Sequence, residues 1–86
     1  MKIKDDFLKE IGIKISEFRE SKKQKQSDLS FLTGIEKSEI SRYEQGKINL
    51  TMTTLLKFSN ALDVHPRDFF DFEFDLSKYQ IDGSEI

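Results

Sequence analysis

The stretch "QSDLSFLTGIEKSEISRYEQG", residues 26–46, decides the fold of this 86-residue chain. Its two glycines, Gly34 and Gly46, divide it into two segments, because Gly readily takes the left-handed conformation that ends a helix. The apolar positions that we expect to face a core are Leu29 and Leu32, followed by Ile35, Ile40 and Tyr43. The stretch therefore predicts two short helices, at about 25–34 and 37–45, joined by a tight turn.

A longer helix is expected before this stretch. Five apolar residues recur there at spacings of four, four, four and three: Ile3, Phe7, Ile11, Ile15 and Phe18. This is the periodicity of one helix face, and it predicts a helix over about residues 5–23. Gly12 lies inside that helix, where Gly costs about 1 kcal/mol relative to Ala. We therefore expect a close packing contact at Gly12.

Two further helices are expected after the stretch. A loop, "KINL" at residues 47–50, leads to a helix that begins at Thr51 and ends at Asp63. Its inward stripe is Met52, Leu55, Phe58, Ser59 and Leu62. A one-turn fifth helix follows in "HPRDFF", residues 65–70, because Pro66 suits a first helical position. We interpret His65 as a cap of this turn and not as a metal ligand, since a zinc site needs further ligands at set spacing.

The pattern changes at the C-terminal segment "DFEFDLSKYQIDGSEI", residues 71–86. Apolar residues alternate there with polar ones at a period of two, which is strand spacing. The alternating residues are Phe70, Phe72, Phe74 and Leu76. Because an isolated strand is not stable, the segment either pairs with a partner strand or forms a loosely packed tail. We divide the chain into an all-α, five-helix domain of residues 1–70 and an acidic, aromatic extension of residues 71–86.

The charge is unevenly distributed, although the whole chain has a net charge of -2. Residues 1–57 contain 10 Lys and 2 Arg against 9 acidic residues, whereas residues 58–86 contain 2 basic and 7 acidic residues. The densest basic stretch is "RESKKQK", residues 19–25, which includes Lys22, Lys23 and Lys25. This stretch is either a surface that faces phosphates or a solvated helix end, and charge alone favours the solvated end.

Length and composition exclude several classes of protein. A chain of 86 residues can form one core but no deep cleft between two lobes, so we expect a binding module and not an enzyme. No Cys is present, which excludes disulfides and Cys-based zinc sites. We expect no cofactor and no metal. No apolar run approaches the roughly 18–20 residues of a membrane span, and no signal peptide precedes the domain, so a cytoplasmic protein without membrane contact is expected.

Residues 26–46, with "TLLKFSNALDVHPRDFF" at residues 54–70, resemble the phage repressor and Cro type of helix-turn-helix domain, also called the XRE family. The resemblance covers about residues 11–70 and includes the spacing of Gln26, Gly34 and Gly46. It implies a phage repressor-like fold in which the second short helix enters the major groove of duplex DNA. It also implies a role in transcription regulation.

The resemblance assigns roles to individual residues. Lys37, Ser38 and Arg42 match positions that face base edges, and all three side chains can hydrogen-bond there. Gln26, Glu36, Ser41 and the amides after Gly46 match positions that face or flank the DNA backbone. With the lysines of the basic stretch, the predicted backbone contacts are Lys22, Lys23, Lys25, Gln26, Ser41 and Lys47. Glu39 either accepts from a cytosine amino group or pairs with a nearby base on the helix, and we favour the pairing. We expect Glu44 to be structural.

Two flanking residues depart from the family pattern. Lys25 stands where the family usually has a Ser or Thr cap, so the second helix loses a side-chain cap worth about 1 kcal/mol. Lys25 adds a charge that can reach a phosphate. Glu36 likewise stands before the third helix where a hydroxyl is common, and its carboxylate opposes binding to phosphates.

A single recognition helix contacts too few base pairs for useful specificity, so we expect a homodimer on a pseudo-palindromic operator. The predicted dimer interface consists of Phe70, Phe72, Phe74 and Leu76, paired with their two-fold copies as an antiparallel ribbon. The alternative is a protein-interaction module, such as an antitoxin-like partner whose acidic, aromatic extension covers a basic site on a second protein. The two functions do not exclude each other.

Overall fold

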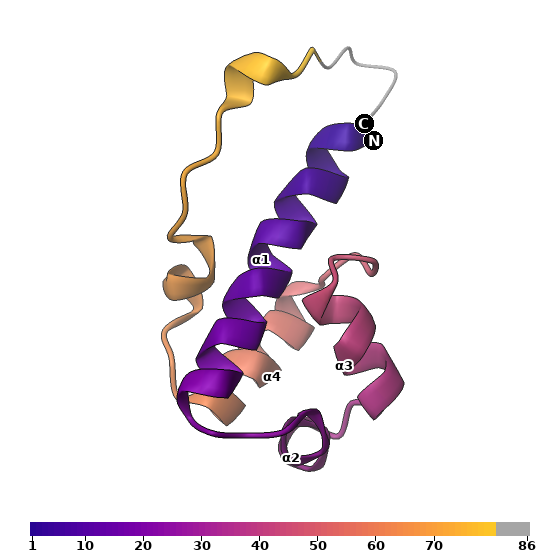
Figure 1. Cartoon of the computed structure of the whole chain (residues 1–86), viewed down its shortest axis with the longest axis vertical. Helices are drawn as coiled ribbons and strands as arrows, with labels where there is room; N and C mark the ends of the chain where they lie inside the picture. The colour runs from indigo at the N-terminus through magenta and orange to yellow at the C-terminus, as the bar shows by residue number, and fades with distance from the viewer. Residues whose placement is uncertain (81–86) are drawn as a thin grey trace.

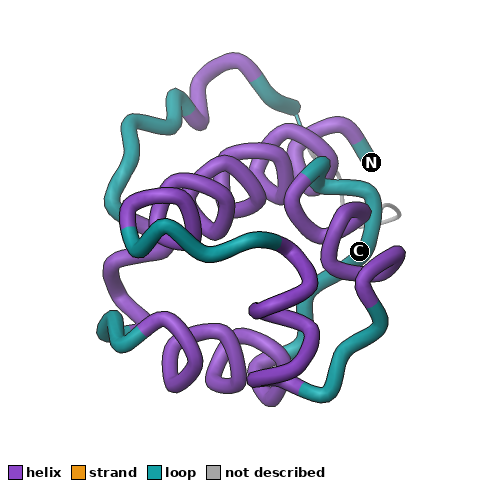
Figure 2. The backbone as a smooth tube through the Cα atoms, turned by 60° about the horizontal axis from the view of Figure 1, so that its bottom comes forward, coloured by secondary structure: helices purple, strands orange, loops and turns teal. Residues whose placement is uncertain are grey.

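The computed structural model describes residues 1–80 of the protein, and four α-helices lie within residues 1–62 (Figure 1). The helices are α1 (Lys2–Ser21), α2 (Gln26–Thr33), α3 (Lys37–Glu44) and α4 (Met52–Leu62). Two short 3-10 helices follow, η1 (Pro66–Phe70) and η2 (Leu76–Lys78). Figure 2 shows only helices and loops in this part of the chain. The all-α class is confirmed, and the expected fifth helix is the 3-10 helix η1. None of these helices is long and apolar enough to cross a membrane.

Each of the four α-helices is followed within two residues by a left-handed backbone position. The φ angles are 57° at Lys23, 75° at Gly34, 73° at Gly46 and 54° at Asp63. After α3, the amide of Lys47 donates to the Arg42 carbonyl at 2.9 Å, and that of Gly46 to Tyr43 at 3.1 Å. This pair of hydrogen bonds is the Schellman motif, which satisfies carbonyls that the last helical turn leaves free. The left-handed conformation expected at Gly34 is confirmed.

The core lies between the four helices and η1. Its buried apolar residues are Ile11, Ile15, Leu29, Ile35, Ile40, Leu55, Phe58, Leu62 and Phe69. Tyr43 is half-buried, and its ring packs edge-on against Phe58 with centroids 5.6 Å apart. Two predictions of inward positions were wrong: Leu32 is 51% exposed and Met52 is 65% exposed. Both lie near the edge of an apolar stripe, where the sequence period does not separate buried from exposed positions.

Gly12 forms the close contact expected of it. A Cβ atom at this position would lie 2.4 Å from the Glu44 carbonyl oxygen and 2.6 Å from that of Tyr43. The backbone of α1 therefore touches the backbone at the end of α3. Gly46 makes the reciprocal contact, since a Cβ atom there would lie 2.6 Å from the Lys9 Cα atom. These two glycines fix where α1 crosses α3.

The C-terminal strap, residues 71–80, returns along α1 on the side away from α3 (Figure 1). The ring of Phe7 lies 5.0 Å from that of Phe72 and 4.9 Å from that of Phe74, measured between centroids. Tyr79 stacks on Phe74, and its hydroxyl donates to the Asp6 carboxylate at 2.7 Å. Within the single chain the strap is thus neither a strand nor a loose tail, because its aromatic rings pack on α1. The rest of the predicted extension, residues 81–86, lies outside the described residues.

Candidate nucleic-acid interface

The outer face of α3 presents polar side chains to solvent. Lys37, Ser38 and Arg42 are exposed, whereas Ile40 on the opposite face is fully buried. Ser38 and Arg42 are four residues apart and share one face, which continues to Gln45 at the end of the helix. The three residues predicted to face base edges therefore lie together on an exposed helix surface. The hydrogen bonds that they can donate suit the acceptors of guanine, and Ser can also accept.

A buried ion pair fixes the end of α3. The Arg19 Nε atom donates to the Glu44 carboxylate at 2.7 Å, and its Nη2 atom donates to the same group at 3.1 Å. The side chains of Arg19 and Glu44 are only 12% and 8% exposed. A third guanidinium nitrogen donates to the Gln24 carbonyl at 2.8 Å. This two-pronged geometry is the strong form of an Arg–carboxylate contact, and the hydrogen bond to Glu44 is the main reason that the pKa of Arg19 is raised above its ordinary value.

The same carboxylate positions the residue that begins α2. Gln26 donates its side-chain amide to Glu44 at 3.0 Å. An amide nitrogen carries two hydrogens, so Gln26 retains one donor for a further acceptor. The structural role expected of Glu44 is confirmed, because its carboxylate joins α1, α2 and α3. The role of Arg19 was not predicted from the sequence, where Arg19 counted only as one charge of the basic stretch. Its partner Glu44 is distant in sequence, so no local pattern indicates the ion pair.

The basic cluster, Lys22, Lys23 and Lys25, lies between α1 and α2. All three residues are exposed, and no ion pair within residues 1–80 includes them. Lys25 makes no side-chain cap to α2, as expected, and Asp28 accepts from its backbone amide at 2.8 Å. These lysines therefore present three positive charges next to Gln26 at the start of α2.

The remaining predicted residues have varied surroundings. Lys47 is exposed in the turn after α3, and Ser41 is half-buried and accepts a hydrogen bond from Gln45 at 3.1 Å. The surface ion pair favoured for Glu39 was wrong for the described residues, since none of their ion pairs includes it. His65 has the capping role expected of it, because its Nδ1 atom accepts from the Arg67 amide at 3.1 Å.

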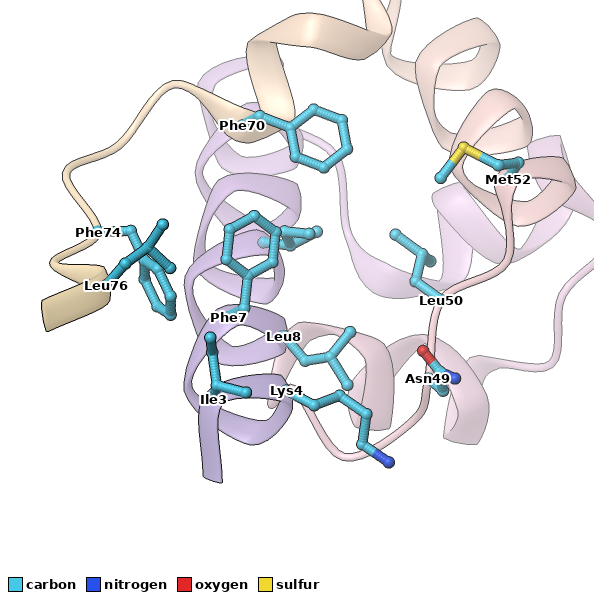
Figure 3. Close-up of a pocket in the computed structure, with 11 residues that line it drawn as sticks. Ile3, Lys4, Phe7, Leu8, Asn49, Leu50, Met52, Phe70, Phe74 and Leu76 are labelled. Atoms are coloured by element: carbon cyan, nitrogen blue, oxygen red, sulfur yellow. The ribbon is translucent and has the colours of Figure 1, made fainter. Parts of the chain in front are cut away.

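A second surface feature is an apolar groove of about 450 Å³ beside the N-terminal half of α1 (Figure 3). Phe70, Phe74 and Leu76 line one side of the groove, and Leu50 and Met52 line the other. Phe70 is 40% exposed and Leu76 is 65% exposed. Of the predicted dimer residues, Phe70 and Leu76 are thus available to a partner, whereas Phe72 and Phe74 are half-buried against α1.

Comparisons with known proteins agree with this geometry. The family model of the Cro/C1-type HTH DNA-binding domain matches residues 14–75. The chain is similar to the restriction-modification controller protein C.AhdI from Aeromonas hydrophila, with 35% identity over 73% of this chain and 96% of that one, and a TM-score of 0.71. It is also similar to the controller protein C.Esp1396I, solved as a tetramer in complex with its natural 35 base-pair operator. That match has 28% identity over 76% of this chain and 86% of the other, with a TM-score of 0.69. A comparison with curated protein sequences gives no match.

Proposed function

The chain belongs to the Cro/C1-type helix-turn-helix DNA-binding family, and from this membership we propose that it regulates transcription as a homodimer on a pseudo-palindromic operator. Members of this family are DNA-binding regulators and not enzymes. The observation that carries the proposal is the exposed polar face of α3, held in place by the buried Arg19–Glu44 pair. The similarity to two restriction-modification controller proteins makes the genes of such a system a first choice when operators are sought. We place this activity in the cytoplasm.

In the proposed complex, α3 lies in the major groove and Lys37, Ser38 and Arg42 read base edges. The reach and the several donors of Arg42 suit the O6 and N7 atoms of guanine. Gln26 uses its second amide hydrogen on a phosphate, and the neighbouring lysines of the basic cluster approach the same strand. Ser41 and Lys47 flank the base-reading face on the backbone side. These roles are supported by the exposure of the three base-reading residues, the basic cluster and Lys47, whereas Gln26 and Ser41 are half-buried.

The base-reading role of Arg42 is tested with an Arg42→Ala variant and a panel of single-base variants of a selected operator. We expect the variant to stay folded, because Arg42 is exposed, and to lose about 1–3 kcal/mol on the best site. The variant should also discriminate less between bases at one base pair in each half-site. Arg67→Ala is the matched control, since Arg67 is also exposed but lies on η1. An equal loss of affinity on every operator variant would show that Arg42 contacts phosphate or supports the fold.

We place the dimer interface at the apolar groove, with a second copy of this chain as its occupant. One recognition helix reads too few base pairs, so a two-fold partner is needed for specificity. The exposed apolar side chains of Phe70, Met52 and Leu76 border the groove, and such a contiguous patch is typical of interfaces. The interface combines the predicted residues Phe70, Phe72, Phe74 and Leu76 with residues of α1 and α4.

This interface is tested by Leu76→Asp, with Phe31→Asp as the control. Leu76 is 65% exposed in the groove, and Phe31 is 88% exposed on α2, so neither change should unfold the monomer. We expect Leu76→Asp to raise the dimer dissociation constant at least tenfold in sedimentation experiments without DNA, because a charge would be buried at the interface. Phe31→Asp should leave it unchanged. Equal behaviour of the two variants would move the interface elsewhere.

Binding of a protein partner through the extension is a second candidate function. Asp71, Glu73 and Asp75 are exposed along the strap while the intervening aromatic rings face α1. This acidic edge is available to a basic surface on another protein. Replacing the three residues with Asn, Gln and Asn keeps the aromatic packing, so full-length protein can be used. If the variant no longer binds the partner protein but still binds DNA, this function is supported. If the variant still binds both the partner protein and DNA, this function is excluded.

A further inference from the structure

A hollow of about 380 Å³ lies beside the N-terminal half of α1, whereas the basic cluster follows the other end of that helix. Lys4 and Lys9 of α1 line the hollow, together with Gln45, Gly46 and Lys47 from the end of α3. The backbone of Gly46 approaches that of Lys9 so closely that a Cβ atom on Gly46 would lie 2.6 Å from the Lys9 Cα atom. This approach brings Lys47 to the same hollow as Lys4 and Lys9, although Lys47 is distant from them in sequence. One surface thus combines charges from two elements.

The side chains that line the hollow are more basic than acidic, although Lys9 also faces a neighbouring hollow lined by acidic residues. Asp5 is the one carboxylate among its lining residues. Asp6 accepts from Tyr79 at 2.7 Å and pairs with Lys2 at 3.3 Å, and the charge of Lys9 contributes to lowering its pKa. Within the part of the chain that the structure describes, no ion pair includes Lys4, Lys9 or Lys47. Three lysines against one aspartate leave a net positive surface.

The hollow lies next to the base-reading face of α3. Gln45 both continues the exposed face of Ser38 and Arg42 and lines the hollow. The backbone of α1 crosses the end of α3 at Gly12, so Lys9 and Lys22 lie on opposite sides of that crossing. They are 13 residues apart, or about 20 Å along a helix at 1.5 Å per residue. The major groove is about 12 Å wide, so the two basic groups can reach the strands on both of its walls.

We propose that Lys4, Lys9 and Lys47 form a second phosphate-binding site for duplex DNA, which contacts the strand opposite to the one held by Gln26 and the basic cluster. This inference rests on the proposed function and adds α1 to the DNA-binding surface. The ligand is a backbone phosphate, so the site adds affinity for every sequence and no base preference. Two phosphate contacts on opposite walls of the groove also fix the tilt of α3.

The test is the salt dependence of DNA binding by the full-length double variant Lys4→Gln/Lys9→Gln. Its dimer dissociation constant is measured alongside, because Lys4 also lines the apolar groove. Fluorescence anisotropy with one selected operator between about 50 and 200 mM salt gives the slope of log K against log[salt]. Each phosphate contact contributes about 0.9 to this slope, and the dimer carries two copies of each lysine. We therefore expect the slope to become shallower by up to about 4. Lys57→Gln/Arg67→Gln removes the same charge from α4 and η1, and it should leave the slope unchanged. Lys4→Arg/Lys9→Arg should also keep the slope of the unmodified protein.

The outcomes separate this inference from the proposed function. Unmodified protein that shows no salt-dependent binding to duplex DNA would overturn both. Normal binding with an unchanged slope in the Lys4→Gln/Lys9→Gln variant would overturn only the second phosphate site. Phosphate ethylation interference locates the phosphates that the protein contacts. Compared with the unmodified protein, the variant should lose interference on one strand of each half-site, while interference at the phosphates near Gln26 remains. Loss on the same strand as Gln26 would contradict the placement.

Discussion

The effect of Gly12→Ala on the unfolding free energy depends on the close contact between α1 and α3. The substitution stabilises the protein if the contact is absent and destabilises it if the contact is present. In an open helix the substitution would stabilise the protein by about 1 kcal/mol, because Ala is the better helix former. In this structure the added Cβ would lie 2.4 Å from one carbonyl oxygen of α3 and 2.6 Å from another. Both neighbours are backbone atoms, which cannot rotate away as a side chain can.

The magnitude follows from the size of the overlap. Ordinary contacts of a Cβ atom are 3.4–4 Å, so α3 must move by about 1 Å. Overpacking of this kind typically costs about 1–3 kcal/mol, and we take about 3 because a helix must shift. After the gain of about 1 kcal/mol in helix propensity, the expected loss of unfolding free energy is about 2 kcal/mol. Operator affinity should fall as well, because the shift displaces the base-reading face.

Gly34→Ala is the matched control for this experiment. Gly34 has a φ of 75° and nothing within 4 Å of its Cβ position, so Ala there meets only backbone strain of about 1 kcal/mol. Urea unfolding followed by circular dichroism measures both variants, and the midpoint of Gly12→Ala should fall further by roughly 1 M, given a slope near 1 kcal/mol per M. A Gly12→Ala protein as stable as the unmodified chain would refute the contact.

Three further predictions concern an ion pair, a helix end and a hydrogen bond. Arg19→Met should lower the unfolding free energy by about 3 kcal/mol, since the Glu44 carboxylate would stay buried without its partner; a loss below about 1 kcal/mol in urea unfolding would contradict this. Lys23→Gly should raise stability by about 1 kcal/mol, because Lys23 has a φ of 57°. The same change should make the salt slope of DNA binding shallower by about 2, since the dimer loses one charge from each copy. The hydrogen bond from Tyr79 lowers the pKa of Asp6 below 3.8, and the same bond raises the pKa of Tyr79 above 10.0. The strap contact should therefore persist from about pH 4 to pH 10, weaken as pH falls through the lowered pKa of Asp6, and weaken as pH rises through the raised pKa of Tyr79; in Tyr79→Phe, an NMR titration should show the Asp6 pKa returning toward 3.8.

The sequence predicted the elements whose cause is local. Gly34 marked the end of α2, and the buried stripe of Leu55, Phe58 and Leu62 marked α4, because helix ends and helical periodicity are properties of neighbouring residues. The Gly12 contact was predicted from the same rule, as a residue whose cost in a helix needs compensation. The helix that it touches could not be named from sequence.

The sequence did not predict features that depend on distant residues. Alternating aromatic residues in the extension indicated a strand, but Phe72 and Phe74 instead pack on Phe7. Period-two spacing places side chains on one side of any extended segment, and only the partner surface decides whether that segment becomes a strand. The Arg19–Glu44 pair was missed for the same reason, since its members are 25 residues apart.

Two neighbouring departures from favourable helix-end chemistry, between α1 and α2, both carry lysine, whereas Glu36 and Asp63 are unfavourable helix-end residues elsewhere in the fold. Lys23 takes a left-handed backbone that Gly or Asn would adopt at lower cost, and Lys25 stands at the N-cap of α2 without a side-chain cap. Each departure costs about 1 kcal/mol, and the two lysines lie on one exposed surface beside Gln26. A solvated helix end gives no reason to accept both costs at neighbouring positions, whereas a phosphate-binding surface does, because it needs charge there and not stability. Local unfavourable chemistry therefore favours the phosphate-facing interpretation of the basic cluster over the solvated one that charge alone favoured.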